Sequence, residues 1–215
     1  MLSGPFLSNF VLLLSEHQDR FTHHVLRCTK SAERIYHLSV VYGGHGRSSL
    51  AFASGKGYLK TVNFLVTRRG ADVHAGGDEA LRWASNHGHL EVTQFLILKG
   101  ADVHAKNGEA LRCASRNGHL EVVQFLVSQG ADANASDALV WASHNGYLEV
   151  VKSLVLGGAD IHANYGYALT WASENGHLDV AKFLVSKGAD VHDDNDEALI
   201  CASMYNHLEV VKFLI

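Results

Sequence analysis

Histidine, cysteine and aspartate are the side chains in this sequence that could do chemistry. The 215 residues include fifteen histidines and three cysteines, and these are the residue types that bind zinc. One position, however, recurs along the chain and is held by four of the histidines, His74, His104, His162 and His192. Ligands of one zinc ion each lie about 2 Å from it, whereas neighbouring helical units pack about 10 Å apart. A row of this kind therefore predicts a structural role and no metal site.

A second row of histidines, and two of the cysteines, are likewise predicted to have a structural role. Histidine alternates with tyrosine at a position that comprises Tyr58, His89, His119, Tyr147, His177 and His207. A polar tip that caps a turn is sufficient there. The cysteines alternate with aromatic residues at a position that comprises Phe52, Trp83, Cys113, Trp141, Trp171 and Cys201. A site that accepts Phe, Trp or Cys is a packing site and not the site of a nucleophile.

The sequence contains no arrangement that is typical of an enzyme. The recurring aspartates lie one per repeat, whereas carboxylates that share acid–base work must lie close together. Gly-rich phosphate loops, Ser-His-Asp arrangements and zinc-ligand spacings are absent from the sequence. His23, His24 and Cys28 are close in sequence but show no known spacing. We therefore predict a protein that is not an enzyme and has no catalytic residues, no cofactor and no metal.

These positions form rows because the chain is built from repeats. The segment Gly-Ala-Asp begins at Gly70, Gly100, Gly130, Gly158 and Gly188. Within residues 109–130, apolar residues that start at Ala110 and follow helical spacing predict a first helix. Asn117-Gly118 ends it, because glycine adopts the left-handed conformation without steric cost, and a second apolar stripe begins at Leu120. Two helices this short are marginal alone, so we expect stacked helix pairs that stabilise one another.

One repeat, residues 100–129, resembles the ankyrin repeat in its sequence GADVHAKNGEALRCASRNGHLEVVQFLVSQ. The resemblance covers residues 49–215 and implies a mainly α fold, an ankyrin-repeat solenoid of stacked helix-turn-helix units with short finger loops. It implies six repeats, the last of them truncated. In the family an asparagine at the position of His74 ties the finger to the neighbouring repeat, and the recurring aspartate forms the finger's turn.

The repeats depart from the family in length. They are 30 residues long, whereas the usual ankyrin repeat has 33. The missing residues fall in the finger, and the finger at residues 131–137 is two residues shorter still. This loss argues against regular β-hairpins at the finger tips. Short repeats of this style resemble those of ankyrin proteins from giant DNA viruses such as mimivirus.

Charge is distributed unevenly along the chain. Residues 1–69 contain nine Lys and Arg against three Asp and Glu, a net charge of +6, whereas residues 70–215 contain nine against nineteen, or −10. An acidic main body argues against a nucleic-acid binder, which would carry a basic stripe. The apolar stretch at residues 6–14 is too short to span a bilayer, so we predict no membrane and no nucleic-acid partner. Free thiols indicate a reducing, intracellular compartment, which the viral resemblance narrows to the host-cell cytoplasm.

The two ends of the chain are irregular, and two interpretations of residues 1–48 stay open. They form an N-terminal cap, in the form of a degenerate repeat, or they are a separate adaptor segment such as a degenerate F-box. At the other end the chain stops at Ile215, inside the second helix of the last repeat and without a closing glycine. We predict a monomer, with weak association through the uncapped C-terminal helix as the alternative.

If the constant positions build the scaffold, recognition belongs to the positions that vary between repeats. These are the finger tips and the ends of the first helices, which line the concave groove in ankyrin proteins, while the asparagines of the Asn-Gly pairs serve turn chemistry. We predict partner binding by Lys56, Asn86, His87, Arg116, His144, Glu174, Met204 and Tyr205 at the helix ends and by Tyr165, Tyr167 and Asp194 in the fingers.

The predicted function is a non-catalytic scaffold for protein–protein interaction. Its partner is a protein, and the viral resemblance implies a host protein. The alternative is an adaptor in which residues 1–48 recruit a ubiquitin-ligase-type machine to a target held by the repeats.

Overall fold

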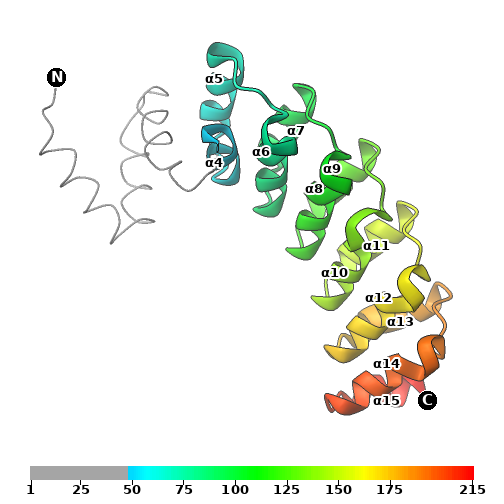
Figure 1. The fold of residues 1–215 in the computed structure, drawn as a ribbon. Helices are drawn as coiled ribbons and strands as arrows, with labels where there is room; N and C mark the ends of the chain where they lie inside the picture. Colours follow the sequence, from blue (N-terminus) through cyan, green and yellow to red (C-terminus); the bar gives the residue numbers. More distant parts are fainter. Residues whose placement is uncertain (1–47) are drawn as a thin grey trace, which may run out of the picture. The chain divides into compact units, whose positions relative to one another are not determined.

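The computed structural model describes residues 48–215, with the exception of the side chains of Ser136, Asn164 and Tyr165. This part of the chain contains twelve α-helices in six consecutive pairs, one short 3-10 turn and no β-strand (Figure 1). The first helices of the pairs are α4 (Ser49–Gly55), α6 (Ala75–Asn86), α8 (Ala105–Arg116), α10 (Ala138–His144), α12 (Ala163–Glu174) and α14 (Asp193–Met204). The second helices are α5 (Leu59–Arg69), α7 (Leu90–Leu98), α9 (Leu120–Ser128), α11 (Leu148–Leu156), α13 (Leu178–Ser186) and α15 (Leu208–Leu214). The predicted mainly α repeat fold is confirmed.

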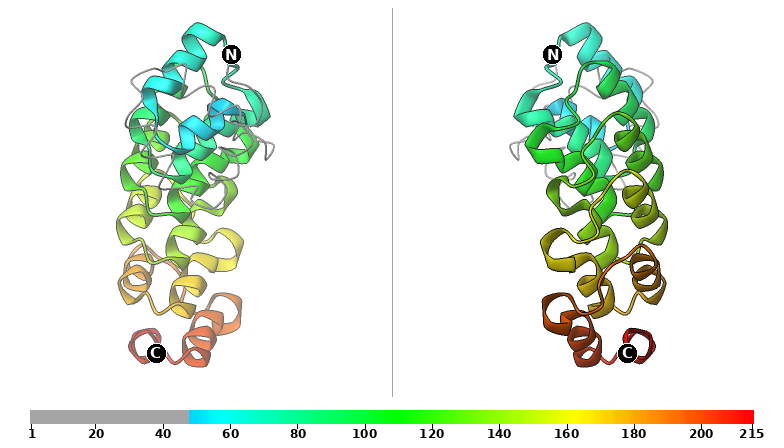
Figure 2. Two further views of the ribbon diagram at one scale, coloured as in Figure 1. Left: turned by 90° about the vertical axis from the view of Figure 1, so that its left-hand side faces the viewer. Right: turned by 90° about the vertical axis from the view of Figure 1, so that its right-hand side faces the viewer.

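The helices stack in two rows, because each packs against its counterpart in the next pair (Figure 2). First helices contact first helices from α6 to α14, and second helices contact second helices from α5 to α15. The interior is built from one leucine of each second helix, Leu65, Leu96, Leu126, Leu154, Leu184 and Leu214, and from one alanine of each first helix, Ala53, Ala84, Ala114, Ala142, Ala172 and Ala202, all buried. Since each apolar face is covered by the neighbouring pair, stability resides in the contacts between repeats.

A residue in the left-handed region separates the two helices of each pair. Gly118 has a φ of 74°, and the corresponding glycines of four other repeats have φ values of 71° to 74°. In the last repeat Asn206 takes this place with a φ of 60°. The predicted helix break at Asn117-Gly118 is therefore confirmed.

The fingers are closed by left-handed turns and not by β-hairpins. Three consecutive residues have positive φ at 76–78 in α6, at 106–108 in α8 and at 194–196 in α14. In the shortened third finger a 3-10 turn, η1 (Ala135–Asp137), replaces this arrangement. The recurring aspartates form turns as predicted, since each accepts a hydrogen bond from the backbone N–H two residues later, at 2.9 Å in all five fingers.

Candidate partner-binding surface

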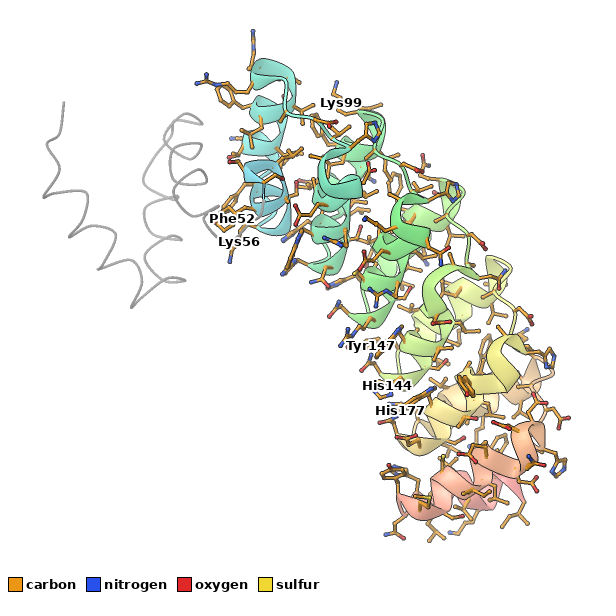
Figure 3. All side chains as sticks on the ribbon, viewed as in Figure 1. Phe52, Lys56, Lys99, His144, Tyr147 and His177 are labelled. Carbon is orange, nitrogen blue, oxygen red and sulfur yellow. The ribbon has the colours of Figure 1, made fainter. Side chains whose placement is uncertain are left out.

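We define the first-helix face as the exposed surface of α4, α6, α8, α10, α12 and α14 and of the turns that follow them. Figure 3 shows Lys56, His144, Tyr147 and His177 at one end of the repeats, where the first helices finish, and Lys99 at the opposite end. The predicted helix-end residues belong to the first of these ends.

Asparagine side chains at the ends of the first helices link neighbouring repeats. Asn117 Nδ2 donates to the carbonyl of Cys113 in its own helix (2.8 Å) and to Oδ1 of Asn86 in the preceding repeat (3.1 Å). Asn145 Nδ2 likewise donates to the carbonyl of Arg116, one repeat back (3.1 Å). The predicted turn role is confirmed, and these residues also bridge the repeats. Asn86, which we predicted to bind a partner, is thus already engaged with Asn117.

The histidines of the turns reach the preceding repeat rather than capping their own turn. In three of them the Nε2 atom donates to a backbone carbonyl at the end of the previous first helix, at 3.0 Å in the pairs His89–Gly55, His119–Asn86 and His177–His144. Burial lowers the pKa of His89 below its usual 6.5, although the hydrogen bond to the Gly55 carbonyl opposes this shift. The expected structural role is correct, but the hydrogen bond connects two repeats.

The finger position that alternates between histidine and asparagine makes different contacts in different fingers, and the Nδ1 atom of His162, for example, lies 4.0 Å from Oδ2 of Asp193 in the next finger. Asn134 Oδ1 accepts from the backbone N–H of Asp160 in the next finger (2.6 Å), as expected of the family. His74 instead contacts Asp78 of its own finger, at 3.2 Å from Nδ1 to Oδ1. That buried carboxylate makes the tie, because its Oδ1 accepts from the N–H of Asp102 (2.9 Å). In this finger the hydrogen bond to the next repeat is therefore made by Asp78 and not by His74.

The two cysteines that the structure describes lie in environments that disfavour the thiolate. Burial is the main cause that raises the pKa of Cys113, and burial together with the nearby Glu197 carboxylate raises that of Cys201 to about 11. Nucleophilic cysteines need the opposite shift. Residues 48–215 also contain no cluster of three or more side chains suited to a metal ion. In the same stretch, every helix is too short or too polar to cross a bilayer.

An ion-pair cluster occupies the first-helix face between α6 and α8. Arg82 contacts Glu109 across the two helices (2.8 Å) and Glu79 within its own helix (3.7 Å). Arg112 contacts the same Glu109 at 2.7 Å. Burial alone would raise the pKa of Glu109, but its hydrogen bonds and the charges of the two arginines outweigh burial and lower it.

Two repeats further along, the face is hollowed by a pocket between α10 and α12. The pocket has a volume of about 510 Å³ and is lined by Asp137, Val140, Trp141, His144, Tyr167 and Trp171; we call it the aromatic pocket. The His144 ring meets Trp141 and Trp171 edge to face, with ring centroids 5.7 and 5.0 Å apart. The guanidinium of Arg116 lies 4.5 Å from the ring centroid of Trp141. The volume is within the range of sites that bind small molecules.

Two of the predicted binding residues, His144 and Tyr167, line this pocket, and a third, Arg116, contacts the ring of Trp141 in its wall. The other helix-end residues are spread over the remaining repeats: Lys56, Asn86, His87, Glu174, Met204 and Tyr205. Asp194 lies in the left-handed turn of the last finger. The side chain of Tyr165 is outside the described part of the chain. The predicted residues whose side chains the structure describes therefore share one face, but only two of them line the pocket.

Sequence reasoning missed the tryptophans that form most of the pocket's aromatic wall. The sequence predicts packing for Trp141 and Trp171, because their position accepts Phe, Trp or Cys. Both are only half-buried, however, and each presents part of its ring to the pocket. The sequence does contain a signal for them, because this position varies from cysteine to tryptophan between repeats. Variation between repeats is also the reason why the helix ends are predicted to bind a partner.

The chain was compared with known proteins. None of the curated proteins matches it. The family model described as ankyrin repeats (3 copies) matches residues 50–137 and 139–215, the stretch over which the six helix pairs are stacked. The chain therefore belongs to the ankyrin repeat family.

Proposed function

We propose that the chain is a non-catalytic scaffold that binds a protein partner across its first-helix face and finger loops. Ankyrin repeats are generally protein-interaction modules. The observation that carries the proposal is a division of labour among side chains. Residues of the recurring histidine and tyrosine position, such as His119 and His177, are used for hydrogen bonds between repeats, whereas residues of varying positions, such as Tyr167, Met204 and Tyr205, are exposed. Exposed aromatic side chains are frequent anchors at interfaces.

Affinity capture from the native cell with a triple variant tests the proposal. Changing His87, Glu174 and Tyr205 to alanine alters the ends of three first helices. The matched control changes Gln94, Gln124 and Lys182, which are exposed at one shared position of the second helices. We expect the helix-end variant to lose partners that the parent and the control both retain. A helix-end variant that keeps every partner of the parent would contradict the proposed surface.

The adaptor hypothesis concerns residues 1–48, of which 1–47 lie outside the described part of the chain. The interpretation of this segment as a cap or degenerate repeat also stays a prediction. Deletion of residues 1–46 separates the two functions, because an adaptor would then lose its ubiquitin-ligase-type machine and keep the target of its repeats. A deletion that leaves all partners in place would favour the scaffold alone.

The viral origin, the host partner and the host cytoplasm are part of this proposal and rest on the short length of the repeats. The monomeric state, with weak association through the last helix as its alternative, is likewise a proposal. Mass measured as a function of concentration decides between these two states, since a concentration-independent monomer mass excludes the association.

A further inference from the structure

The aromatic pocket lies where another pair of repeats has an arginine. Val140 of α10 corresponds in the repeat to Arg82 of α6, because both follow an Ala-Leu pair. Asp137 corresponds to Glu79, so a carboxylate is kept while the arginine is replaced by valine. Between α6 and α8 the guanidinium of Arg82 bridges two glutamates. Between α10 and α12 the corresponding side chains leave a pocket of about 510 Å³.

On the opposite side of the pocket, an aromatic residue replaces the glutamate of the earlier pair of repeats. Tyr167 of α12 takes the place that Glu109 has in α8, and Trp141 and Trp171 complete the wall. Aromatic faces attract cations through the ring quadrupole, most strongly for tryptophan and most often with arginine. This chain already shows such a contact at the same ring, because the Arg116 guanidinium lies 4.5 Å from the centroid of Trp141.

The surrounding charge favours a cation as well. Residues 70–215 have a net charge of −10, and a field of this sign raises the local concentration of positive groups. Of the side chains that line the pocket, Asp137 is acidic and none is a lysine or an arginine, and the cation nearest to the wall is Arg116, whose guanidinium lies against Trp141. A planar guanidinium can stack on an indole and meet a carboxylate at its edge, which a compact ammonium cannot do equally well.

We propose that the aromatic pocket binds an arginine side chain of the protein partner, whose guanidinium stacks on the tryptophan rings near Asp137. This inference rests on the proposed function, since it assigns one specificity site on the first-helix face. The partner's arginine takes the place that Arg82 fills internally two repeats earlier. The pocket thus selects partner segments that present an exposed arginine.

Peptide titration on the full chain tests the assignment. The probes are acetyl-Gly-Gly-Arg-Gly-Gly-amide, the same peptide with citrulline, which keeps the shape and removes the charge, and the same peptide with lysine. Binding is followed by the indole N–H signals of Trp141 and Trp171 in NMR spectra. We expect the arginine peptide to bind about tenfold more tightly than the citrulline peptide, as a cation–aromatic contact with a nearby carboxylate implies. The lysine peptide should be weaker by several-fold.

Four variants connect the binding to the pocket. Trp171→Ala should abolish it, whereas Trp83→Ala, at the corresponding position beside the ion-pair cluster, should leave it unchanged. Asp137→Asn should weaken the arginine peptide and leave the citrulline peptide unaffected. Val140→Arg restores the residue type of Arg82 and should block the pocket from within. Cysteine occupies the tryptophan position in two repeats, so a small residue there is compatible with folding, and circular dichroism checks each variant.

Each result has a defined consequence. Equal affinity for the arginine and citrulline peptides would overturn the requirement for charge, and a lysine peptide that binds as tightly would overturn the guanidinium assignment. No binding of the arginine peptide, or unchanged binding to Val140→Arg, would reject the site. The outcome is independent of the capture experiment. If the arginine peptide does not bind, the pocket assignment is wrong, but the capture experiment can still identify partners that depend on His87, Glu174 and Tyr205. If the capture experiment identifies no such partner, the proposed function is wrong, but the peptide titration can still show that the pocket binds arginine.

Discussion

The contact between Gly88 and His119 is predicted to hold two neighbouring repeats together. Gly88 lies in the left-handed region with a φ of 73°. A Cβ atom added there would lie 2.6 Å from Nδ1 of His119, so the ring would have to move. The ring's Nε2 donates to the carbonyl of Asn86 at 3.0 Å, and that hydrogen bond would be lost with the movement.

The magnitude follows from two separate costs. A left-handed residue with a Cβ is less stable by about 1–2 kcal/mol, and loss of the hydrogen bond, with a partly buried carbonyl left unpaired, costs about 1–2 kcal/mol more. Gly70 provides the matched control, because its φ is 65° and an added Cβ would have no heavy atom within 4 Å. Gly70→Ala should therefore lower the free energy of unfolding only by the backbone cost of about 1–2 kcal/mol. Gly88→Ala should lower it by both costs, about 2–4 kcal/mol.

The assay is urea unfolding of the full chain followed by circular dichroism, with both alanine variants also made in a His119→Ala background. Once the imidazole is removed, Gly88→Ala should destabilise no more than Gly70→Ala, and the difference between backgrounds gives the coupling energy. Equal losses for the two glycine variants in the wild-type background would refute the reasoning. So would an excess loss for Gly88→Ala that persists without the imidazole.

Three further predictions concern single residues. Ser115→Ala should raise the free energy of unfolding by about 1 kcal/mol, because the serine hydroxyl is fully buried without a hydrogen-bond partner; urea unfolding that shows a loss would contradict this. Lys106→Gly should raise Tm by about 2 °C, since φ at Lys106 is 53° and glycine avoids the strain; an unchanged or lower Tm in a thermal melt would count against it. The pKa of His89 is lowered mainly by burial, so the unfolded state binds more protons and stability should fall as pH drops from about 6.5 towards the folded-state pKa. His89→Tyr should reduce this decline in unfolding experiments between neutral and acidic pH, and an identical pH profile would exclude the histidine as its source.

The helix pairs could be predicted from the sequence because their signals are local. The apolar spacing after Ala110 and the break at Gly118 each follow from backbone geometry and side-chain burial, and the structure confirms both. The left-handed finger turns could not be predicted in the same way. Gly76 and Gly77 tolerate positive φ, but a lysine seldom adopts it, so the φ of 53° at Lys106 has no signal in the sequence.

The two histidine rows show how far the repeat pattern extends into the site. Recurrence predicted that His119 is structural, and the hydrogen bond to Asn86 agrees. The same recurrence gave His74 the family's inter-repeat role, which Asp78 performs instead. A repeat identifies equivalent positions, but the hydrogen-bond partner depends on side chains that differ from one finger to the next.

The sequence does not predict the aromatic pocket, because the same tryptophan position serves both packing and recognition. Trp141 serves both, since one part of its ring contacts Arg116 and another lines the pocket. The decisive difference between this pair of repeats and the earlier one is the exchange of Arg82 for Val140, which is visible in the sequence but has no meaning until the neighbouring helix is known. Once α10 and α12 are seen side by side, the exchange leaves a carboxylate and three aromatic rings around a space that an arginine fills elsewhere. In a repeat protein, a binding site is therefore best sought where a long side chain that fills the space between two helices in one pair of repeats is replaced by a shorter one in another pair.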